Sequence, residues 1–512
     1  MTPQLVVCSR RRNETVRVGW SVLLFFRLRV WFRLPFERRA IAVLLVLVFC
    51  SIVLVSVGDR SRPTVRWFNW SERSVGADAA AMLFTFSRPM DAASIESSFQ
   101  LTPSFPGRFS WAGRRLAFTP ELPLPYGLEY TVQLLAGKEK RSPQRPLVPF
   151  QSTFRTHDRA FAYLGVDGEE EGRLLLYNLT RQQQQMLTPP DWVVLDFLPY
   201  PHGDRILFSA IPRQKTATIA SAALYSVTTG LNYCNPEPAP CELRSRGGEV
   251  QEILSSQDYQ NLAFDLSADG QTIIVLRSNQ KIPNAALELW KVPATGDPTV
   301  IQRDPGGEFR IAPDNNSLVI AQGQGLAVLP LEAGSDPLDF LPQFGRVLGF
   351  SRDGTQAATV RFNSDFRQSL FWVDSAGKRQ ELRTVEGEIL SADFAPNRKA
   401  LYSLLSETDD AEFLSLFAFD LKTSKPQGNL LLKIPRQGPV NLDLAPDGLA
   451  VIFDQPIATP TTATDVATAA SPRSQLWVLP LTPPSSTLAQ AQEQLPQPEA
   501  LPLQGVRPRW VP

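Results

Sequence analysis

The sequence predicts an all-β fold, in which a β-sandwich is followed by a β-propeller and one helix precedes them both. Three observations predict it. A short hairpin motif recurs down the second half of the 512-residue chain. Short strands of alternating character, divided by Pro and Gly, fill residues 62–156. A single uncharged apolar run occupies residues 40–57.

The composition describes a globular protein, with 43% hydrophobic and 20% charged residues. The formal net charge is zero, so no global field favours a nucleic acid as a partner. That neutrality hides an asymmetry, because residues 1–39 carry many arginines against only Glu14 and Glu37. We interpret residues 1–39 as a basic cytoplasmic tail.

The apolar run at residues 40–57 predicts one transmembrane helix. Eighteen residues at 1.5 Å each span about 27 Å, close to the thickness of the hydrocarbon core of a bilayer. The flanking arginines should stay in the cytoplasm, which places the rest of the chain outside it. We therefore expect a single-pass protein of the cell (inner) membrane with a periplasmic or extracellular bulk. A cleaved signal peptide, cut near Ser56 or Gly58, is the alternative.

Residues 62–156 predict a β-sandwich, since several short strands lie between turn residues. The expected strands cover residues 81–86, 107–111, 115–119, 128–134 and 149–156. We expect Trp111 and Tyr130 to lie in its core.

This segment resembles the bacterial Ig-like domain of surface-layer and envelope proteins. The resemblance rests on F-S-R-P-M-D at 86–91, S-F-Q-L-T-P at 98–103, and the closing S-T-F-R-T at 152–156. It runs over nearly the whole segment, with the elements in the order of the family. The resemblance implies a spacer or adhesion module without chemistry of its own.

From residue 157 to 512 a repeated strand, turn and strand indicates propeller blades. The clearest copy is F-S-R-D-G-T-Q-A-A-T-V at 350–360, and Asp-Gly is a favoured pair for a tight hairpin. Other copies begin at residues 197, 266, 311, 394 and 444. A period of roughly 40 to 50 residues with about four strands per unit is typical of a β-propeller.

The two ends of the repeat region predict how the ring closes. Residues 159–165 and 173–179 look like second and third strands with no first strand before them, whereas residues 506–512 look like a first strand. We infer that the C-terminal strand completes the first blade and removes two exposed sheet edges. This gives seven blades, with six as the alternative. The turns are similar to those of the TolB-like propellers of the bacterial periplasm, and they lack the marks of WD repeats.

Two further features of the propeller region concern its loops. Cys234 and Cys241 lie in the Pro-rich segment C-N-P-E-P-A-P-C, and we expect a local disulfide between them outside the cytoplasm. Two unpaired thiols are the alternative. Residues 456–474 and 482–500 are of low complexity, and we expect mobile loops there.

No linear motif indicates catalysis, a cofactor or a metal site. The chain has two histidines, His157 and His202, and no G-x-S-x-G elbow for a Ser-His-Asp arrangement. We expect both histidines to lie in a linker or turn. The acidic runs at residues 169–171 and 409–410 are interpreted as solvated loops, with calcium binding as the lesser alternative. Tryptophans recur at one position of several blades and are expected to pack between sheets: Trp290, Trp372 and Trp477.

Two hypotheses for function follow. The first is a non-enzymatic, membrane-anchored scaffold or binding protein of the bacterial envelope, whose propeller binds a protein or an envelope polymer. The second is a carbohydrate-active or hydrolytic propeller whose acidic site is dispersed around the central channel. Carboxylates at the channel would favour the second hypothesis, and a purely apolar channel would exclude it.

Overall fold

The computed structural model describes residues 36–57, 61–76, 79, 81–214, 218–231, 246–303, 305–332, 337–423, 425–457, 473–481 and 497–512. The chain divides into two units, Met1–Pro63 and Thr64–Pro512, which are treated separately. Cys234, Cys241 and most of the two low-complexity segments lie outside the described residues, as does the basic tail up to residue 35.

The described residues of the first unit include one helix, α2 (Phe36–Val57). It begins four residues before the apolar run, so Glu37, Arg38 and Arg39 are helical and do not belong to an extended tail. Glu and Arg are good helix formers, which explains the earlier start. In the part of the chain that the structure describes, no helix combines the length and the apolar character needed to cross a membrane.

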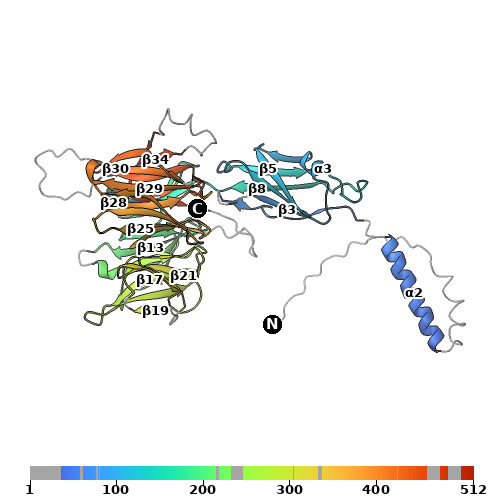
Figure 1. Ribbon diagram of the computed structural model, residues 1–512, viewed down its shortest axis with the longest axis horizontal. Coiled ribbons are helices and arrows are strands. Elements are labelled where there is room, and N and C mark those ends of the chain that lie inside the picture. The colour runs from blue at the N-terminus through green and yellow to red at the C-terminus, as the bar shows by residue number, and fades with distance from the viewer. Residues whose placement is uncertain are drawn as a thin grey trace, which may run out of the picture. The chain divides into compact units, whose positions relative to one another are not determined.

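The second unit begins with a β-sandwich of two four-stranded sheets (Figure 1). The expected strands are present, and a short helix, α3 (Ala92–Glu96), is capped by the Asp91 carboxylate, which accepts a hydrogen bond from the Ser94 N–H. The first sheet has the order β1 (Val65–Phe68), β3 (Met82–Phe86), β6 (Arg115–Pro120), β5 (Gly107–Ala112). The second has the order β2 (Ser74–Val75), β8 (Phe150–Thr156), β7 (Glu129–Leu134), β4 (Phe99–Thr102).

Aromatic side chains from both sheets form the core of the sandwich. Phe68 stacks on Phe84 with ring centroids 4.5 Å apart, and Phe154 of the opposite sheet stacks on Tyr130 at 5.2 Å. Tyr130 is fully buried and Trp111 packs at the edge of the core against Phe86, as expected. Buried and exposed residues alternate along these strands, because each sheet has one face in the core and one face in solvent.

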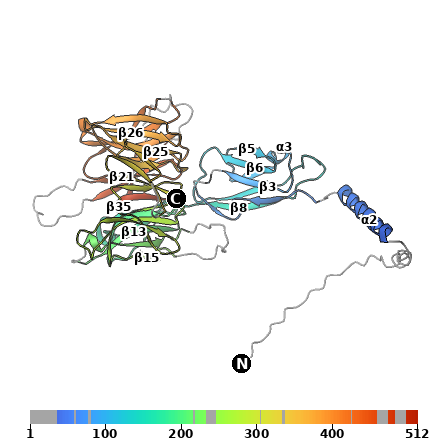
Figure 2. The same cartoon turned by 60° about the horizontal axis from the view of Figure 1, so that its bottom comes forward.

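The remainder of the unit consists of small antiparallel sheets (Figures 1 and 2). Five of the sheets have four strands each, in chain order: β12 (Trp192–Pro199), β13 (Arg205–Pro212), β14 (Ala223–Thr228), β15 (Val250–Leu254); β16 (Tyr259–Leu266), β17 (Thr272–Asn279), β18 (Leu287–Pro293), β19 (Thr299–Arg303); β20 (Phe309–Ile311), β21 (Ser317–Gln322), β22 (Gly325–Pro330), β23 (Asp339–Leu341); β24 (Arg346–Phe350), β25 (Gln356–Phe362), β26 (Gln368–Asp374), β27 (Arg379–Val385); β28 (Gly387–Phe394), β29 (Ala400–Glu407), β30 (Phe413–Asp420), β31 (Gly428–Pro435). A seven-stranded sheet has the order β11 (Gln183–Met186), β10 (Leu174–Asn178), β9 (Ala160–Gly165), β35 (Glu499–Val511), β34 (Ser474–Pro480), β33 (Ala450–Pro456), β32 (Leu442–Leu444).

These sheets pack face to face around a common axis and form a β-propeller. The second strand of each sheet is almost wholly buried, and apolar clusters fill the space between neighbouring sheets. First strands of successive sheets contact one another from β16 through β20, β24, β28 and β32 to β35, and β35 contacts β12. A sheet of four short strands cannot cover both of its own faces, so burial requires the ring.

Strand β35 closes the ring, and the prediction that a C-terminal strand pairs with residues 159–165 is confirmed. Its last part pairs with β9, with Trp510 opposite Phe161. Its first part pairs with β34, so one long strand belongs to two neighbouring sheets. The expected loop at 482–500 is therefore wrong at its end, because β35 begins at Glu499. Asp454 is buried and fastens the bulge of β35 by accepting hydrogen bonds from the backbone N–H groups of Asn441 and Arg507.

The repeated turn between first and second strands has one conformation throughout. Its fifth residue adopts a positive φ in the five copies that begin at residues 266, 311, 350, 394 and 444, namely Gly270, Asn315, Gly354, Arg398 and Gly448. These turns also link neighbouring sheets, since Asn315 accepts a hydrogen bond from the Asp269 N–H and Arg398 forms an ion pair with Asp353. The favoured Asp-Gly pair thus fixes both the hairpin and its contact with the next sheet.

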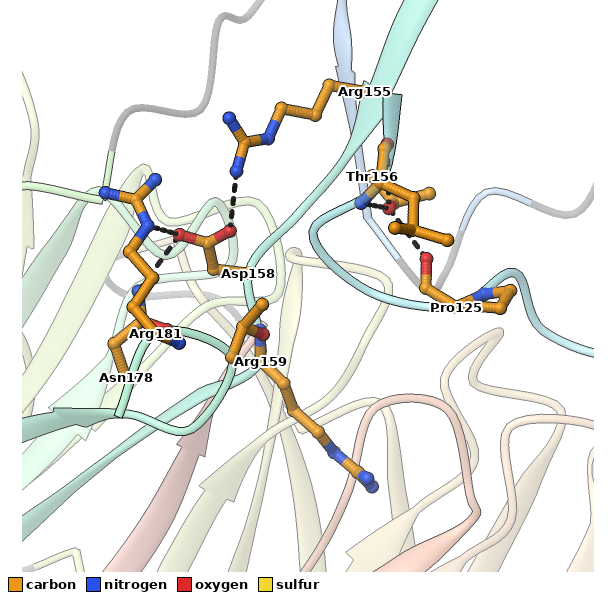
Figure 3. Close-up of polar contacts among 9 residues, drawn as sticks. Pro125, Arg155, Thr156, Asp158, Arg159, Asn178 and Arg181 are labelled. Carbon is orange, nitrogen blue, oxygen red and sulfur yellow. Dashed lines mark hydrogen bonds and ion pairs between the residues drawn. The ribbon is translucent and has the colours of Figure 1, made fainter. Parts of the chain in front are cut away.

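A network of polar contacts joins the sandwich to the propeller (Figure 3). Asp158 is buried between Arg155 of β8 and Arg181 of the propeller, with its carboxylate 3.2 Å and 2.6 Å from their guanidinium nitrogens. It also accepts a hydrogen bond from the Asn178 amide. The Thr156 hydroxyl donates to the Pro125 carbonyl, which ties the last strand of the sandwich to its own preceding loop.

Candidate functional site

One position of each first strand faces the propeller axis. It is the residue that pairs with the third residue of the neighbouring second strand (β13, β17, β21, β25, β29, β33 or β9), and the pairing register identifies it in each first strand. Asp265 pairs with Ile274, for example, and Asp393 pairs with Tyr402 in the same place. We call these seven residues the axial ring: Leu198, Asp265, Arg310, Gly349, Asp393, Asp443 and Arg509.

The charged members of the axial ring lie near one another, although they come from five different strands, β16, β20, β28, β32 and β35. Asp265 lies 3.8 Å from the Arg310 guanidinium of the next sheet. The charges of Arg310 and Arg509 both act on Asp265 and on Asp393, which lie in sheets that are not neighbours. Such coupling requires that these side chains meet around the axis.

Burial raises the pKa of each carboxyl in the axial ring, and the two arginines only partly offset it. The pKa of Asp393 rises to about 6. The pKa of Asp443 rises to about 7, because burial and the charge of Asp393 outweigh the attraction of Arg509. Both pKa values lie near neutral pH, which is where the pKa of a general acid or base works best.

Two of the three carboxylates also hold the propeller together. Asp265 accepts a hydrogen bond of 2.7 Å from the Ile311 N–H, and Asp443 accepts one of 2.6 Å from the Trp510 N–H. Each bond runs from one sheet to the first strand of the next. No equivalent hydrogen bond to the Asp393 side chain is present among the described residues, so Asp393 is the member whose position is least explained by folding.

A second feature is a set of exposed apolar side chains in two adjacent sheets, at β23 and at the connection between β25 and β26. We call Leu338, Phe340, Phe362 and Phe366 the aromatic patch. Their side chains are between 49% and 95% exposed. The Phe340 ring lies over Gly325 and the Phe362 ring over Gly345, where any side chain in place of hydrogen would collide with them. Glycine at these two positions thus allows two large rings to lie flat on the surface.

Phe366 is the most exposed residue of the aromatic patch, and its backbone is strained. It has a φ of 65° and occupies a turn in which the Asn363 N–H donates to the Arg367 carbonyl and the Phe366 N–H donates to the Asn363 carbonyl. A bulky residue at positive φ is rare and is associated with functional sites. The same two sheets and their connections carry three ion pairs: Arg346 with Glu308, Arg361 with Glu381, and Arg367 with Asp365.

The residues singled out in the sequence do not form a site. His202 lies in the exposed turn between β12 and β13, as expected, whereas His157 is half-buried at the joint and both its backbone groups are bonded. The acidic runs form short 3₁₀ turns, η1 (Gly168–Glu170) and η3 (Thr408–Asp410). Across the described part of the chain, no three metal-ligating side chains converge.

Two of the three recurrent tryptophans, Trp372 and Trp477, pack between sheets as expected, and the expectation is wrong for Trp290. Trp372 is buried between sheets, Trp477 stacks on Phe453, and Trp290 packs edge-on against Tyr259 of its own sheet. The axial ring was missed, although the sequence carries its signal. Four of its members, Asp265, Arg310, Asp393 and Asp443, stand directly before a copy of the repeated turn, each as a charged residue between two apolar ones.

No family model and no curated protein matches the chain. Among solved structures it is similar to TolB from Acinetobacter baumannii, at 12% identity and a TM-score of 0.38, over 81% of this chain and 83% of that one. It is also similar to a putative 6-phosphogluconolactonase from Bacteroides uniformis, at 12% identity and 0.41, over 69% and 100%. An oligogalacturonate lyase from Vibrio parahaemolyticus matches at 13% and 0.41, over 58% and 87%. Likenesses this distant say nothing about the activity of the chain.

Proposed function

We propose that this chain is a membrane-anchored scaffold or binding protein of the bacterial envelope, and that its propeller holds a protein partner or an envelope polymer. The aromatic patch carries the proposal. Exposed apolar surfaces rimmed by polar residues are typical of protein interfaces, whose centres are enriched in aromatic residues. The strained, fully presented Phe366 supports the same role, because nothing in the fold of its hairpin requires a phenylalanine there.

The test compares partners recovered by crosslinking in intact cells. The full-length protein and a Phe362→Ser/Phe366→Ser variant are purified in mild detergent, and the crosslinked species are identified by mass spectrometry. A stoichiometric partner that is lost in this variant supports the proposal. The matched control replaces two exposed leucines of the sandwich, Leu83→Ser and Leu128→Ser. Equal recovery in all three proteins would show that the aromatic patch has no binding role.

The anchor is proposed from the uncharged run at residues 40–57 and from the arginines before it. The N-terminus would then lie in the cytoplasm and residues 62–512 outside it. Extraction of membranes with alkaline carbonate tests the anchor, since an integral protein stays in the pellet. Protease protection in spheroplasts tests the orientation, because residues outside the inner membrane are cleaved.

Three finer features belong to the same proposal. We propose seven blades, because β35 supplies the fourth strand of one sheet and the first strand of the next. We propose that residues 62–156 are an Ig-like spacer, on the resemblance described above. Cys234 and Cys241 would form a disulfide outside the cytoplasm, which mass spectrometry of unreduced peptides would detect.

The alternative function is hydrolytic, with carbohydrate as one substrate class. The observation that favours it is the pair Asp393 and Asp443, whose raised pKa values suit proton transfer near neutral pH. A screen of glycans and hydrolase substrates with the full-length protein tests it. The hydrolytic function would be favoured over the scaffold function if the activity is lost in Asp393→Asn and kept in the Phe362→Ser/Phe366→Ser variant.

A further inference from the structure

Two rings of the aromatic patch, Phe362 and Phe366, lie far from the sandwich. Strand β25 starts after the repeated turn that contains Arg352, which lines a cavity of about 310 Å³ together with Trp70 of the sandwich. The strand ends at Phe362, and Phe366 follows in the connection to β26. Its seven residues extend over about 20 Å. The sandwich therefore does not cover these two rings.

The apolar area of the aromatic patch is small for a folded partner. Phe340, Phe362 and Phe366 are 49%, 57% and 95% exposed. With Leu338 they offer roughly 500 Å² of apolar surface, if a whole phenylalanine side chain offers about 200 Å². A stable protein interface buries about 800 Å² on each partner. A folded protein, or a second copy of this chain, would therefore have to cover the neighbouring polar groups as well.

The polar groups beside the two rings hold one another in place. The Arg361 guanidinium donates to the Asn363 amide oxygen at 2.8 Å and to the Glu381 carboxylate at 3.3 Å. Asp365 forms an ion pair with Arg367 at 3.9 Å. The four charged side chains are between 40% and 59% exposed, so water still solvates them. Each charge of this hairpin has a partner of opposite sign.

These ion pairs decide which kind of occupant fits beside the rings. An apolar surface laid over them would remove their water and leave hydrogen-bonding groups without partners, which costs free energy. A strongly charged occupant would find no excess of opposite charge on the hairpin. An occupant with hydroxyl groups can take the place of the lost water, because a hydroxyl both donates and accepts hydrogen bonds. The fitting occupant is thus neutral, with an apolar face and hydroxyl groups at its edge.

Neutral sugar chains have this combination of surfaces. In a β-linked chain of glucose-type pyranoses the ring substituents are equatorial, so each sugar has a face of C–H groups and a rim of hydroxyl groups. The face of an aromatic ring carries partial negative charge and attracts such C–H groups. Phe366 presents almost its whole ring to such a face.

We propose that the aromatic patch binds a neutral, β-linked glycan chain. One sugar stacks on Phe366, and its hydroxyl groups bond to the ion pairs of Arg361 and Asp365. This inference rests on the proposed function and selects the envelope polymer over the protein partner. No covalent step is involved.

Binding is measured by isothermal titration calorimetry on the full-length protein, in a detergent without a sugar headgroup. The neutral β-linked probes are cellohexaose and chitohexaose, and the α-linked control is maltohexaose. We expect at least one β-linked probe to bind with a Kd below about 1 mM, and maltohexaose to bind at least about tenfold more weakly. Absence of saturable binding of both β-linked probes up to about 10 mM would overturn the proposal, as would equally tight binding of maltohexaose.

Two substitutions at one position test the stacking. Phe366→Tyr keeps the aromatic face, so the Kd should stay within about threefold of that of the natural protein. Phe366→Leu keeps an apolar side chain without that face and should weaken binding at least about tenfold, on the scale of a hot spot. Neither change should unfold the protein, because the side chain is 95% exposed. Equal binding by the two variants would contradict the stacking.

The matched control for the position is Ile282→Ser. Ile282 is 57% exposed in the connection between β17 and β18, which corresponds to that between β25 and β26 in another blade. It should leave glycan binding unchanged, whereas Phe362→Ser/Phe366→Ser should abolish it. If both retain binding, the glycan binds elsewhere and the proposal is wrong.

The two experiments separate this inference from the proposed function. If no β-linked probe binds, but crosslinking still recovers a partner that depends on Phe362 and Phe366, the glycan inference is wrong and the scaffold function stands. If neither glycan binding nor the crosslinked partner depends on these two rings, both proposals fail.

Discussion

At the scale of single residues, the repeated turn depends on one backbone conformation. Glycine fills the positive-φ position in three of the five copies, and Asn315 and Arg398 adopt the same conformation at φ values of 60° and 59°. Asparagine reaches this region with little strain, whereas arginine does not. Arg398 is retained in an unfavourable conformation, and its ion pair with Asp353 offsets part of that cost.

Gly354→Ala is expected to destabilise the protein by about 1 to 2 kcal/mol, because alanine is strained at a φ of 69°. The control is Gly307→Ala, where φ is not in the left-handed region and the added methyl group meets Ala321 at an ordinary distance. The control should change the free energy of unfolding by less than about 0.5 kcal/mol. Urea unfolding of both variants checks the difference, and equal losses would contradict it.

The axial ring predicts a dependence of stability on pH. The carboxyl of Asp443 has a pKa of about 7 in the folded protein, above its ordinary value of about 3.9. Between these pH values the folded state binds more protons than the unfolded state, so stability falls as pH rises from about 4 to about 7. Asp443→Asn removes this titration and keeps an acceptor for the Trp510 N–H.

We therefore expect Asp443→Asn to gain stability relative to the natural protein as pH rises from 4 to 8. The difference of about three units between the folded and the unfolded pKa of Asp443 corresponds to about 4 kcal/mol of unfolding free energy. Water that reaches the half-buried side chain should reduce the gain in stability to about 1 to 2 kcal/mol. Thermal unfolding across this pH range measures it. A difference that stays constant with pH would show that the Asp443 carboxyl does not titrate in this range.

At the scale of elements, strand β35 is the one whose loss should matter most. Trp510 is 3% exposed, packs against Phe161, and donates its indole N–H to the Asp443 carbonyl. Trp510→Ala should cost about 3 to 5 kcal/mol, the range for a large buried aromatic residue. Trp290→Ala is the control, because Trp290 is only partly buried and lies within one sheet. Urea unfolding should show a clearly smaller loss for the control.

Much of this architecture was predictable, and the reasons are local. The spacing of the Asp-Gly turns predicts the blades, because hairpin chemistry lies within a few residues. The lone strand at residues 506–512 predicts the closing pair with β9. The double role of β35 was not predictable, because it depends on a bulge at residues 506–509 that the buried Asp454 stabilises across the sheet.

The candidate sites were less predictable than the fold. The axial ring is a set of residues far apart in the sequence, and only the shared register makes them neighbours. The aromatic patch combines two connections in adjacent sheets, so no window of the sequence contains it.

At the scale of the whole molecule, Asp158 joins the sandwich to the propeller. Asp158→Asn keeps the size of the side chain but removes the charge that two arginines share at a buried position. We expect a loss of about 2 to 3 kcal/mol at this joint, since a charged partner is left unpaired there. Trypsin should then cleave faster after Arg155 or Arg159 than in the natural protein. Asp167→Asn, in an exposed turn, should leave the cleavage rate unchanged.

The sharing of β35 between two sheets also bears on how the protein is made. Residues such as Leu195 and Arg507, which touch across the closure, are 312 positions apart in the sequence. During synthesis the first blade must wait without its inner strand while all the others emerge, with a sheet edge and apolar faces uncovered. Contacts between such distant segments form slowly. A protein built this way needs protection from aggregation until its last strand arrives, and we expect its yield in cells to depend on chaperones.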